Sequence, residues 1–170
     1  MQTTDKLECL EKNAVVNGIR LTYFERGMVY RGVKPTLLFV HATGFHARVW
    51  DKIINALGDF HSISVDQRGH GRSEKKKTQH WSEVITDTSE MIEQLDLTNI
   101  IAIGHSMGAH ALIGAAPKAE HRFLKIIAVI YLQTPKYYCL KGINYHLPKS
   151  EDPMLLMMGK LLVNLIRIQS

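Results

Sequence analysis

The sequence has little cysteine and no long apolar run. Cys9 and Cys139 are the only cysteines in 170 residues, and they form no C-x-x-C motif. This argues against a disulfide framework or a thiolate zinc site, and a cytoplasmic location is expected. Because the N-terminal residues contain no apolar stretch and no segment is long enough to cross a bilayer, neither a signal peptide nor a membrane partner is expected.

Clustered positive charge is also scarce. The formal net charge is +5, but no arginine-rich helix or basic–aromatic interleaving accompanies it. The excess of positive charge is therefore interpreted as keeping the protein soluble, and no nucleic-acid partner is predicted. No cofactor and no metal ion is expected.

Apolar residues make up 45% of the chain, which is enough for the core of one domain. Asn17-Gly18 between β-forming residues predicts a hairpin over residues 14–25. Beyond Pro35, apolar runs of strand length alternate with segments of helical spacing, which predicts a mostly parallel sheet with helices on both faces. The expected strands are 36–40, 62–66, 100–103 and 126–132, and the expected helices are 47–57 and 82–95, with Ser82 as the N-cap of the second.

The pentapeptide Gly104-His105-Ser106-Met107-Gly108 follows the apolar strand at 100–103. A strand that turns straight into a helix holds such a serine in a strained conformation, and the glycines on either side must be small because backbone passes close to them. The Met107 N–H then points into the same space as the Ser106 hydroxyl. The competing interpretation is a glycine-rich turn in which Ser106 only caps the helix.

Three loops follow predicted strands of the same sheet, and they bring the polar motifs to one edge. They are residues 41–45 (His-Ala-Thr-Gly-Phe), 66–73 (Asp-Gln-Arg-Gly-His-Gly-Arg-Ser) and 104–108. In this order and spacing they resemble the α/β-hydrolase superfamily, most closely its esterases, lipases and related serine hydrolases. The resemblance covers residues 15–132.

The resemblance implies a role for each matching residue. Ser106 matches the nucleophile, and Met107 and Thr43 match the residues whose backbone N–H groups form the oxyanion hole. His41, Gly44 and Phe45 are candidates for lining the site, although the family's histidine at this position is usually structural. The 66–73 loop is expected to be structural, with Arg68 tying loops together.

The resemblance also implies an acid and a histidine later in the chain, after two further strands. No match to them is found, so the fold is expected to be truncated after the sixth strand. Residues 1–133 are expected to be the N-terminal part of the domain. Residues 134–170 are expected to hold an irregular, lid-like segment and an apolar helix at 154–168. The expected open edge of the sixth strand would invite pairing with another chain, including self-association.

Other histidines offer weak substitutes for the missing base. In the sharp turn at residues 104–108 (the elbow), consecutive side chains point apart, so His105 is expected to point away from Ser106. His110 is expected to pack against the sheet. His41 and His46 flank the oxyanion loop, and His146 is the only late candidate.

Two functions follow. The first is a serine hydrolase that acts on small carboxylic esters or thioesters through a Ser106 acyl-enzyme, with the triad acid and histidine absent from this chain. The alternative is a catalytically inactive module that binds a partner through its open sheet edge.

Overall fold

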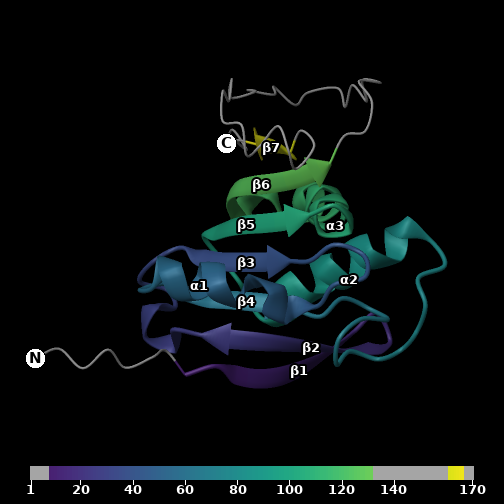
Figure 1. The fold of residues 1–170 in the computed structure, drawn as a ribbon, viewed down its shortest axis with the longest axis horizontal. Helices are drawn as coiled ribbons and strands as arrows, with labels where there is room; N and C mark the ends of the chain where they lie inside the picture. The colour runs from purple at the N-terminus through teal and green to yellow at the C-terminus, as the bar shows by residue number, and fades with distance from the viewer. Residues whose placement is uncertain (1–7, 132–160, 167–170) are drawn as a thin grey trace, which may run out of the picture.

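The computed structural model describes residues 8–131 and 161–166. Within these residues, seven strands form one sheet in the order β1-β2-β4-β3-β5-β6-β7 (Figure 1). The strands are β1 (Leu10–Val16), β2 (Ile19–Arg26), β3 (Thr36–Val40), β4 (Ser62–Val65), β5 (Ile100–His105), β6 (Phe123–Tyr131) and β7 (Leu161–Ile166). The α-helices are α1 (Asp51–Leu57), α2 (Trp81–Gln94) and α3 (Met107–Ala115), and short 3-10 turns include η1 (Met28–Tyr30) and η2 (Ala47–Trp50).

The four central strands are parallel. β3 lies between β4 and β5, and β6 pairs in parallel with β5. The β1–β2 hairpin is antiparallel, and it turns at Asn17 and Gly18, which both have positive φ. The predicted hairpin and the predicted mostly parallel sheet are therefore confirmed.

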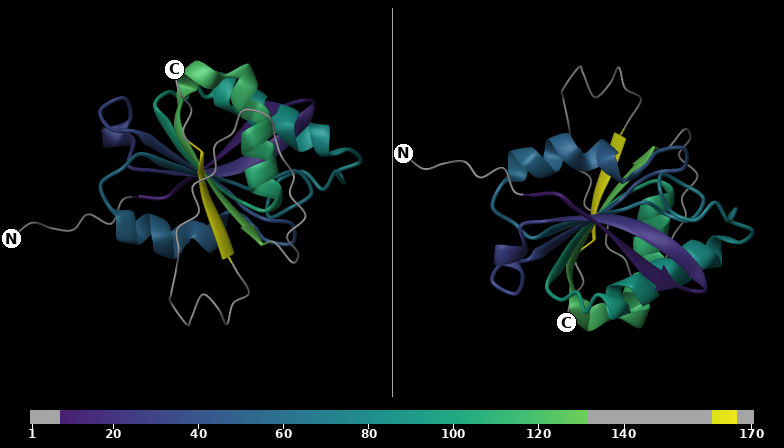
Figure 2. Two further views of the ribbon diagram at one scale, coloured as in Figure 1. Left: turned by 90° about the horizontal axis from the view of Figure 1, so that it is seen from above. Right: turned by 90° about the horizontal axis from the view of Figure 1, so that it is seen from below.

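Helices cover both faces of the sheet, as predicted: α1 lies on one face, and α2 and α3 lie on the other (Figure 2). The larger core lies under α2 and α3. Its buried residues come from the sheet and from these two helices, and they include Leu38, Val40, Ile63, Ile92, Ile100 and Leu112. The smaller core lies under α1 and contains Leu37, Phe39, Trp50 and Ile54. β3 is buried on both faces and is almost continuously apolar, as expected for a parallel strand, whereas β4 alternates with the buried polar residues Ser62 and Ser64.

The apolar residues of the first helical segment are only partly buried. Trp50 and Ile54 are buried, whereas Val49, Ile53 and Leu57 are each more than 40% exposed. The segment begins with η2, whose tighter winding rotates the following residues relative to an uninterrupted α-helix. The two-residue apolar contact is enough to hold this short helix on β3.

The expected N-cap of the next helix is wrong. α2 begins at Trp81 with His80 as its N-cap, two residues before the predicted Ser82. The Glu83 carboxylate accepts the backbone N–H groups of Gln79 and His80, at 2.7 and 3.3 Å. These bonds stabilise the earlier start.

The expected helix at 154–168 is also wrong where the structure describes it. Residues 161–166 form β7, which pairs antiparallel with β6 from Ile126↔Ile166 to Tyr131↔Leu161. An apolar strand with an unpaired edge is strongly favoured to gain a partner, and such pairing can override helical spacing in the sequence. The sheet edge that the sequence left open at β6 is therefore occupied by β7, while residues 154–160 and the predicted boundary at 133/134 lie outside the described residues.

Candidate active site

Ser106 occupies the turn between β5 and α3. Its φ and ψ are 49° and −109°, a left-handed φ that is unusual for a residue with a side chain. The Ser106 N–H donates to the Val129 carbonyl on β6 at 2.9 Å, and the Ser106 carbonyl accepts the His110 N–H at 3.0 Å. Both backbone groups are thus fixed by neighbouring elements, and the side chain is exposed. Strain of this kind is typical of positions whose geometry serves a function.

The two glycines beside Ser106 leave no room for a side chain. A Cβ on Gly108 would lie 2.2 Å from the Val40 carbonyl oxygen, and one on Gly104 would lie 2.6 Å from the Ala109 nitrogen. The obstructing atoms are backbone, which cannot swing aside. These distances confirm the close approach that the sequence predicted on both sides of the serine.

Thr43 and Met107 lie side by side. The Thr43 hydroxyl donates to the Met107 sulfur at 3.4 Å, although the two residues are 64 positions apart. Met107 is the first residue of α3, where a backbone N–H has no partner within the helix. Among the described residues, neither the Thr43 N–H nor the Met107 N–H donates a hydrogen bond to a protein group. The edge next to Ser106 therefore carries two unengaged amide donors from two loops.

His41 lies inside the protein and does not line the site. It is fully buried, and its Nδ1 lies 2.8 Å from the Ala42 carbonyl while its Nε2 accepts the Gln67 N–H at 3.0 Å. Burial lowers the pKa of His41 to about 4. A neutral imidazole with both nitrogens engaged cannot accept a proton from Ser106. The suggestion that His41 lines the site is therefore wrong, and its role is to join two loops.

The buried His41 predicts a loss of stability in acid. The unfolded chain protonates this imidazole below pH 6.5, whereas the folded protein resists protonation down to about pH 4. The free energy of unfolding should therefore fall by about 2 kcal/mol between pH 8 and pH 5 from this residue alone. Burial also lowers the pKa of His61, which adds to the fall in the same direction.

Urea unfolding at the two pH values measures this effect. His41→Gln keeps an acceptor for the Gln67 N–H and should reduce the change in the free energy of unfolding between the two pH values. His46→Gln, at an exposed position, should leave that change as it is in the wild type. Equal slopes for wild type and His41→Gln would contradict the assignment.

Two aromatic–imidazole pairs lie at the same edge of the sheet. Phe45, about half exposed, lies 6.1 Å from the His105 ring, and Trp81 of α2 meets His110 edge-on at 5.2 Å. His110 is exposed, so the expectation that it packs against the sheet is wrong. Its neighbours Ala109 and Ala111 take the buried positions of α3, and their small side chains allow the helix to approach the sheet closely.

The 66–73 loop is tied to the start of η2 and to helix α2. Asp66 accepts the Ala47 N–H at 2.6 Å and the Arg72 N–H at 2.7 Å. Arg68 makes two hydrogen bonds to the Asp87 carboxylate on α2, at 2.5 and 2.6 Å, and both side chains are buried. Arg68 was predicted to tie loops together, and its side chain instead ties this loop to helix α2.

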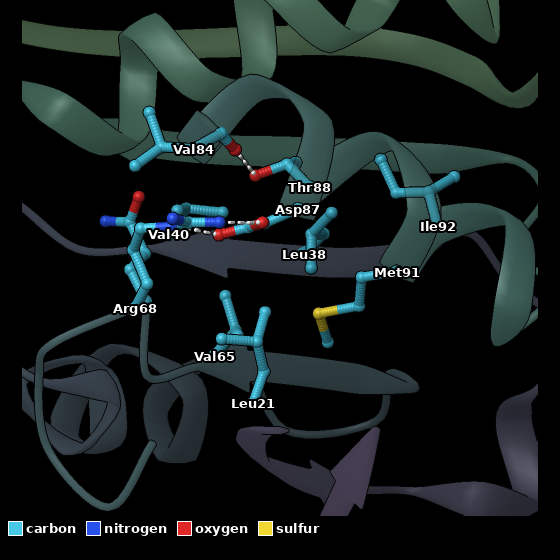
Figure 3. Close-up of a pocket in the computed structure, with 11 residues that line it drawn as sticks. Leu21, Leu38, Val40, Val65, Arg68, Val84, Asp87, Thr88, Met91 and Ile92 are labelled. Atoms are coloured by element: carbon cyan, nitrogen blue, oxygen red, sulfur yellow. Dashed lines mark hydrogen bonds and ion pairs between the residues drawn. The ribbon is translucent and has the colours of Figure 1, made fainter. Parts of the chain in front are cut away.

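A small cavity of about 10 Å³ lies behind this ion pair, between α2 and the sheet (Figure 3). Apolar side chains such as Leu38, Val65 and Met91 line most of it, and no predicted site residue does. Its volume is at the lower limit for one water molecule, so it is a packing gap rather than a substrate site.

His70 joins the 41–45 and 66–73 loops, a role that is not among those predicted from the sequence. Its Nε2 accepts the Gly44 N–H at 3.1 Å, and its Nδ1 lies 2.8 Å from the Arg68 carbonyl. The one sequence feature that could have indicated this role is a side chain able to form hydrogen bonds between Gly69 and Gly71. His146, the late base candidate, lies outside the described residues.

Within residues 8–131 and 161–166, no group of three His, Cys, Asp or Glu side chains is placed to hold a metal ion. In the same part of the chain, no helix has the length and apolar character needed to cross a membrane.

Known proteins resemble this chain over the same region. It is 33% identical over 101 residues to 2-(acetamidomethylene)succinate hydrolase of Mesorhizobium japonicum. This alignment covers 58% of this chain and 36% of that protein. It is 32% identical over 96 residues to a putative esterase/lipase of Haemophilus influenzae, covering 56% and 33% of the two chains. The structure of epoxide hydrolase A from Mycobacterium thermoresistibile superposes with a TM-score of 0.64 at 25% identity, over 78% of this chain and 42% of that one.

The chain thus spans about a third of the length of these curated relatives. A family model described as the alpha/beta hydrolase family matches residues 37–162, which contain all three loops described above. This match and the strained turn at Ser106 agree: the chain belongs to the alpha/beta hydrolase family.

Proposed function

We propose that Ser106 is the nucleophile of a serine hydrolase that acts on carboxylic esters or thioesters through an acyl-enzyme. The observation that carries this proposal is the left-handed Ser106 between two glycines that contact backbone. A cap residue needs no such strain, because ordinary N-caps have extended backbone angles. The exposed hydroxyl at the end of β5 is instead suited to meet a substrate.

In the proposed reaction, the Ser106 oxygen attacks the acyl carbonyl carbon and loses its proton to a base. The tetrahedral oxyanion accepts hydrogen bonds from the Thr43 and Met107 N–H groups, which have no other partner among the described residues. Collapse of this intermediate expels the alcohol or thiol, and water then releases the acid from Ser106.

We infer that the base lies outside the described residues. Both nitrogens of His41 and both nitrogens of His70 are occupied by partners within the loops. Within the described residues, the Ser106 hydroxyl has no hydrogen-bonded histidine. In the two relatives, about two thirds of the protein lies outside the matched region.

Hydrolysis of p-nitrophenyl acetate and of a short acyl thioester tests this function. Replacement of Ser106 by alanine should lower acyl release by at least about tenfold, because the covalent route is removed. Ser82→Ala changes another exposed serine, in the first turn of α2, and should leave the rate unchanged. Equal rates for wild type and Ser106→Ala would reject the proposal.

A further inference from the structure

We propose that His70 is a positioning residue for the oxyanion loop: it accepts the Gly44 N–H and thereby fixes the peptide next to the Thr43 N–H. This inference rests on the proposed function for its catalytic consequence, but not for the hydrogen bond itself.

The two partners of His70 allow only one arrangement of its ring protons. The Arg68 carbonyl can only accept, so the nearby Nδ1, at 2.8 Å, carries the proton and donates. The Gly44 N–H can only donate, so Nε2, at 3.1 Å, is unprotonated and accepts. The neutral imidazole with its proton on Nδ1 satisfies both bonds together.

His70 stands on a rigid base. Its backbone N–H donates to the Gln67 carbonyl at 3.0 Å, and its carbonyl accepts the Ser73 N–H at 3.1 Å. The Arg68 side chain anchors this turn to buried Asp87, and the His70 ring lies 5.1 Å from the buried His41 ring. The acceptor nitrogen is therefore held in place by the protein interior.

Side chains hold the tip of the oxyanion loop (residues 43–45) at two points: the Thr43 hydroxyl donates to the Met107 sulfur, and the Phe45 ring lies near the His105 ring. Neither contact orients the Thr43–Gly44 peptide. Thr43, Gly44 and Phe45 are exposed, and no atom lies within 4 Å of a Cβ built on Gly44, whose φ is +81°. The Phe45 N–H donates to the Ala42 carbonyl at 3.1 Å, which closes the turn but leaves the Thr43–Gly44 peptide to be oriented separately. The bond to His70 supplies that orientation.

Backbone amide signals of the whole chain test this directly. In His70→Phe, the exchange of the Gly44 amide with water should rise about tenfold, which is the effect of losing one ordinary hydrogen bond. The Thr43 amide shift should move with it. His70→Gln places an acceptor near the same point and should restore both signals, and His46→Phe, at an exposed position of the same loop, should change neither. His70→Ala replaces His70→Phe in this experiment if the phenyl ring does not fit against His41.

The catalytic consequence is read from the acylation of Ser106. We expect His70→Phe to lower kcat for p-nitrophenyl acetate about tenfold with KM unchanged, because only the oxyanion donor is misplaced. His70→Gln should recover most of the rate.

Unchanged Gly44 exchange in both His70→Phe and His70→Ala would overturn the inference. A changed exchange with an unmoved Thr43 signal would also overturn it. If the wild-type chain forms no acyl-enzyme, the proposed function of Ser106 fails, whereas the amide signals still decide whether His70 positions this loop.

Discussion

Replacing Arg68 by methionine should destabilise the protein by about 3–5 kcal/mol, the usual cost of breaking a buried ion pair. Arg68 is 2% exposed and makes two short bonds to Asp87, and it lies 3.1 Å from Glu83. Without it, the Asn17 amide, at 2.9 Å, is the one side-chain donor left to the buried Asp87 carboxylate among residues 8–131 and 161–166. Urea unfolding at pH 7 measures the loss.

Two variants separate this effect from a general loss of arginine. The double variant Arg68→Met/Asp87→Leu leaves no unpaired buried charge and should recover at least half of the lost stability. Arg48→Met removes an arginine that is 44% exposed and paired with Asp51, and should cost less than about 1 kcal/mol. A double variant as unstable as Arg68→Met would show that the ion pair is not the cause.

A single methyl group on Gly108 should be almost as costly. The added Cβ of Gly108→Ala would lie 2.2 Å from the Val40 carbonyl oxygen and 2.8 Å from that of His41. Either α3 moves away from β3 or the turn at Ser106 relaxes, so we expect a loss of about 3 kcal/mol, the upper end for overpacking. The reaction of Ser106 with acyl substrates should be lost as well.

Gly32→Ala is the control for Gly108→Ala. Gly32 has a φ of +75° and open space around its Cβ position, so alanine there brings backbone strain of about 1 kcal/mol without a clash. It lies in the turn before β3, away from Ser106, and should leave the reaction intact. Gly108→Ala with wild-type stability and reactivity would contradict the close packing of the elbow.

The sequence predicted the central part of the fold because local and long-range preferences agree there. Asn17-Gly18 favours a hairpin, and the apolar runs of β3 and β5 suit strands buried on both faces. The elbow was predictable for the same reason, since each glycine beside Ser106 is required by an approach of backbone.

The errors arose where tertiary contacts decide between local alternatives. In the predicted helix at 154–168, the polar residues Lys160, Asn164 and Arg167 fall at helical spacing, yet residues 161–166 pair with the apolar edge of β6. Similarly, His110 was assigned to the sheet, although the small residues beside it in α3 occupy that side.

The contacts of His41 and His70 could not be predicted, because they depend on how two loops meet in space. Each ring accepts a backbone N–H from the other loop, from a residue 26 positions away. No sequence spacing reports such a contact.

The most direct test of the central claim is to map the adduct of a fluorophosphonate on the folded chain by mass spectrometry of its peptides. The account predicts one adduct, on Ser106, which disappears in Ser106→Ala and in urea-unfolded wild type. A folded chain that forms no adduct, or forms it on another serine such as Ser82, would contradict the account.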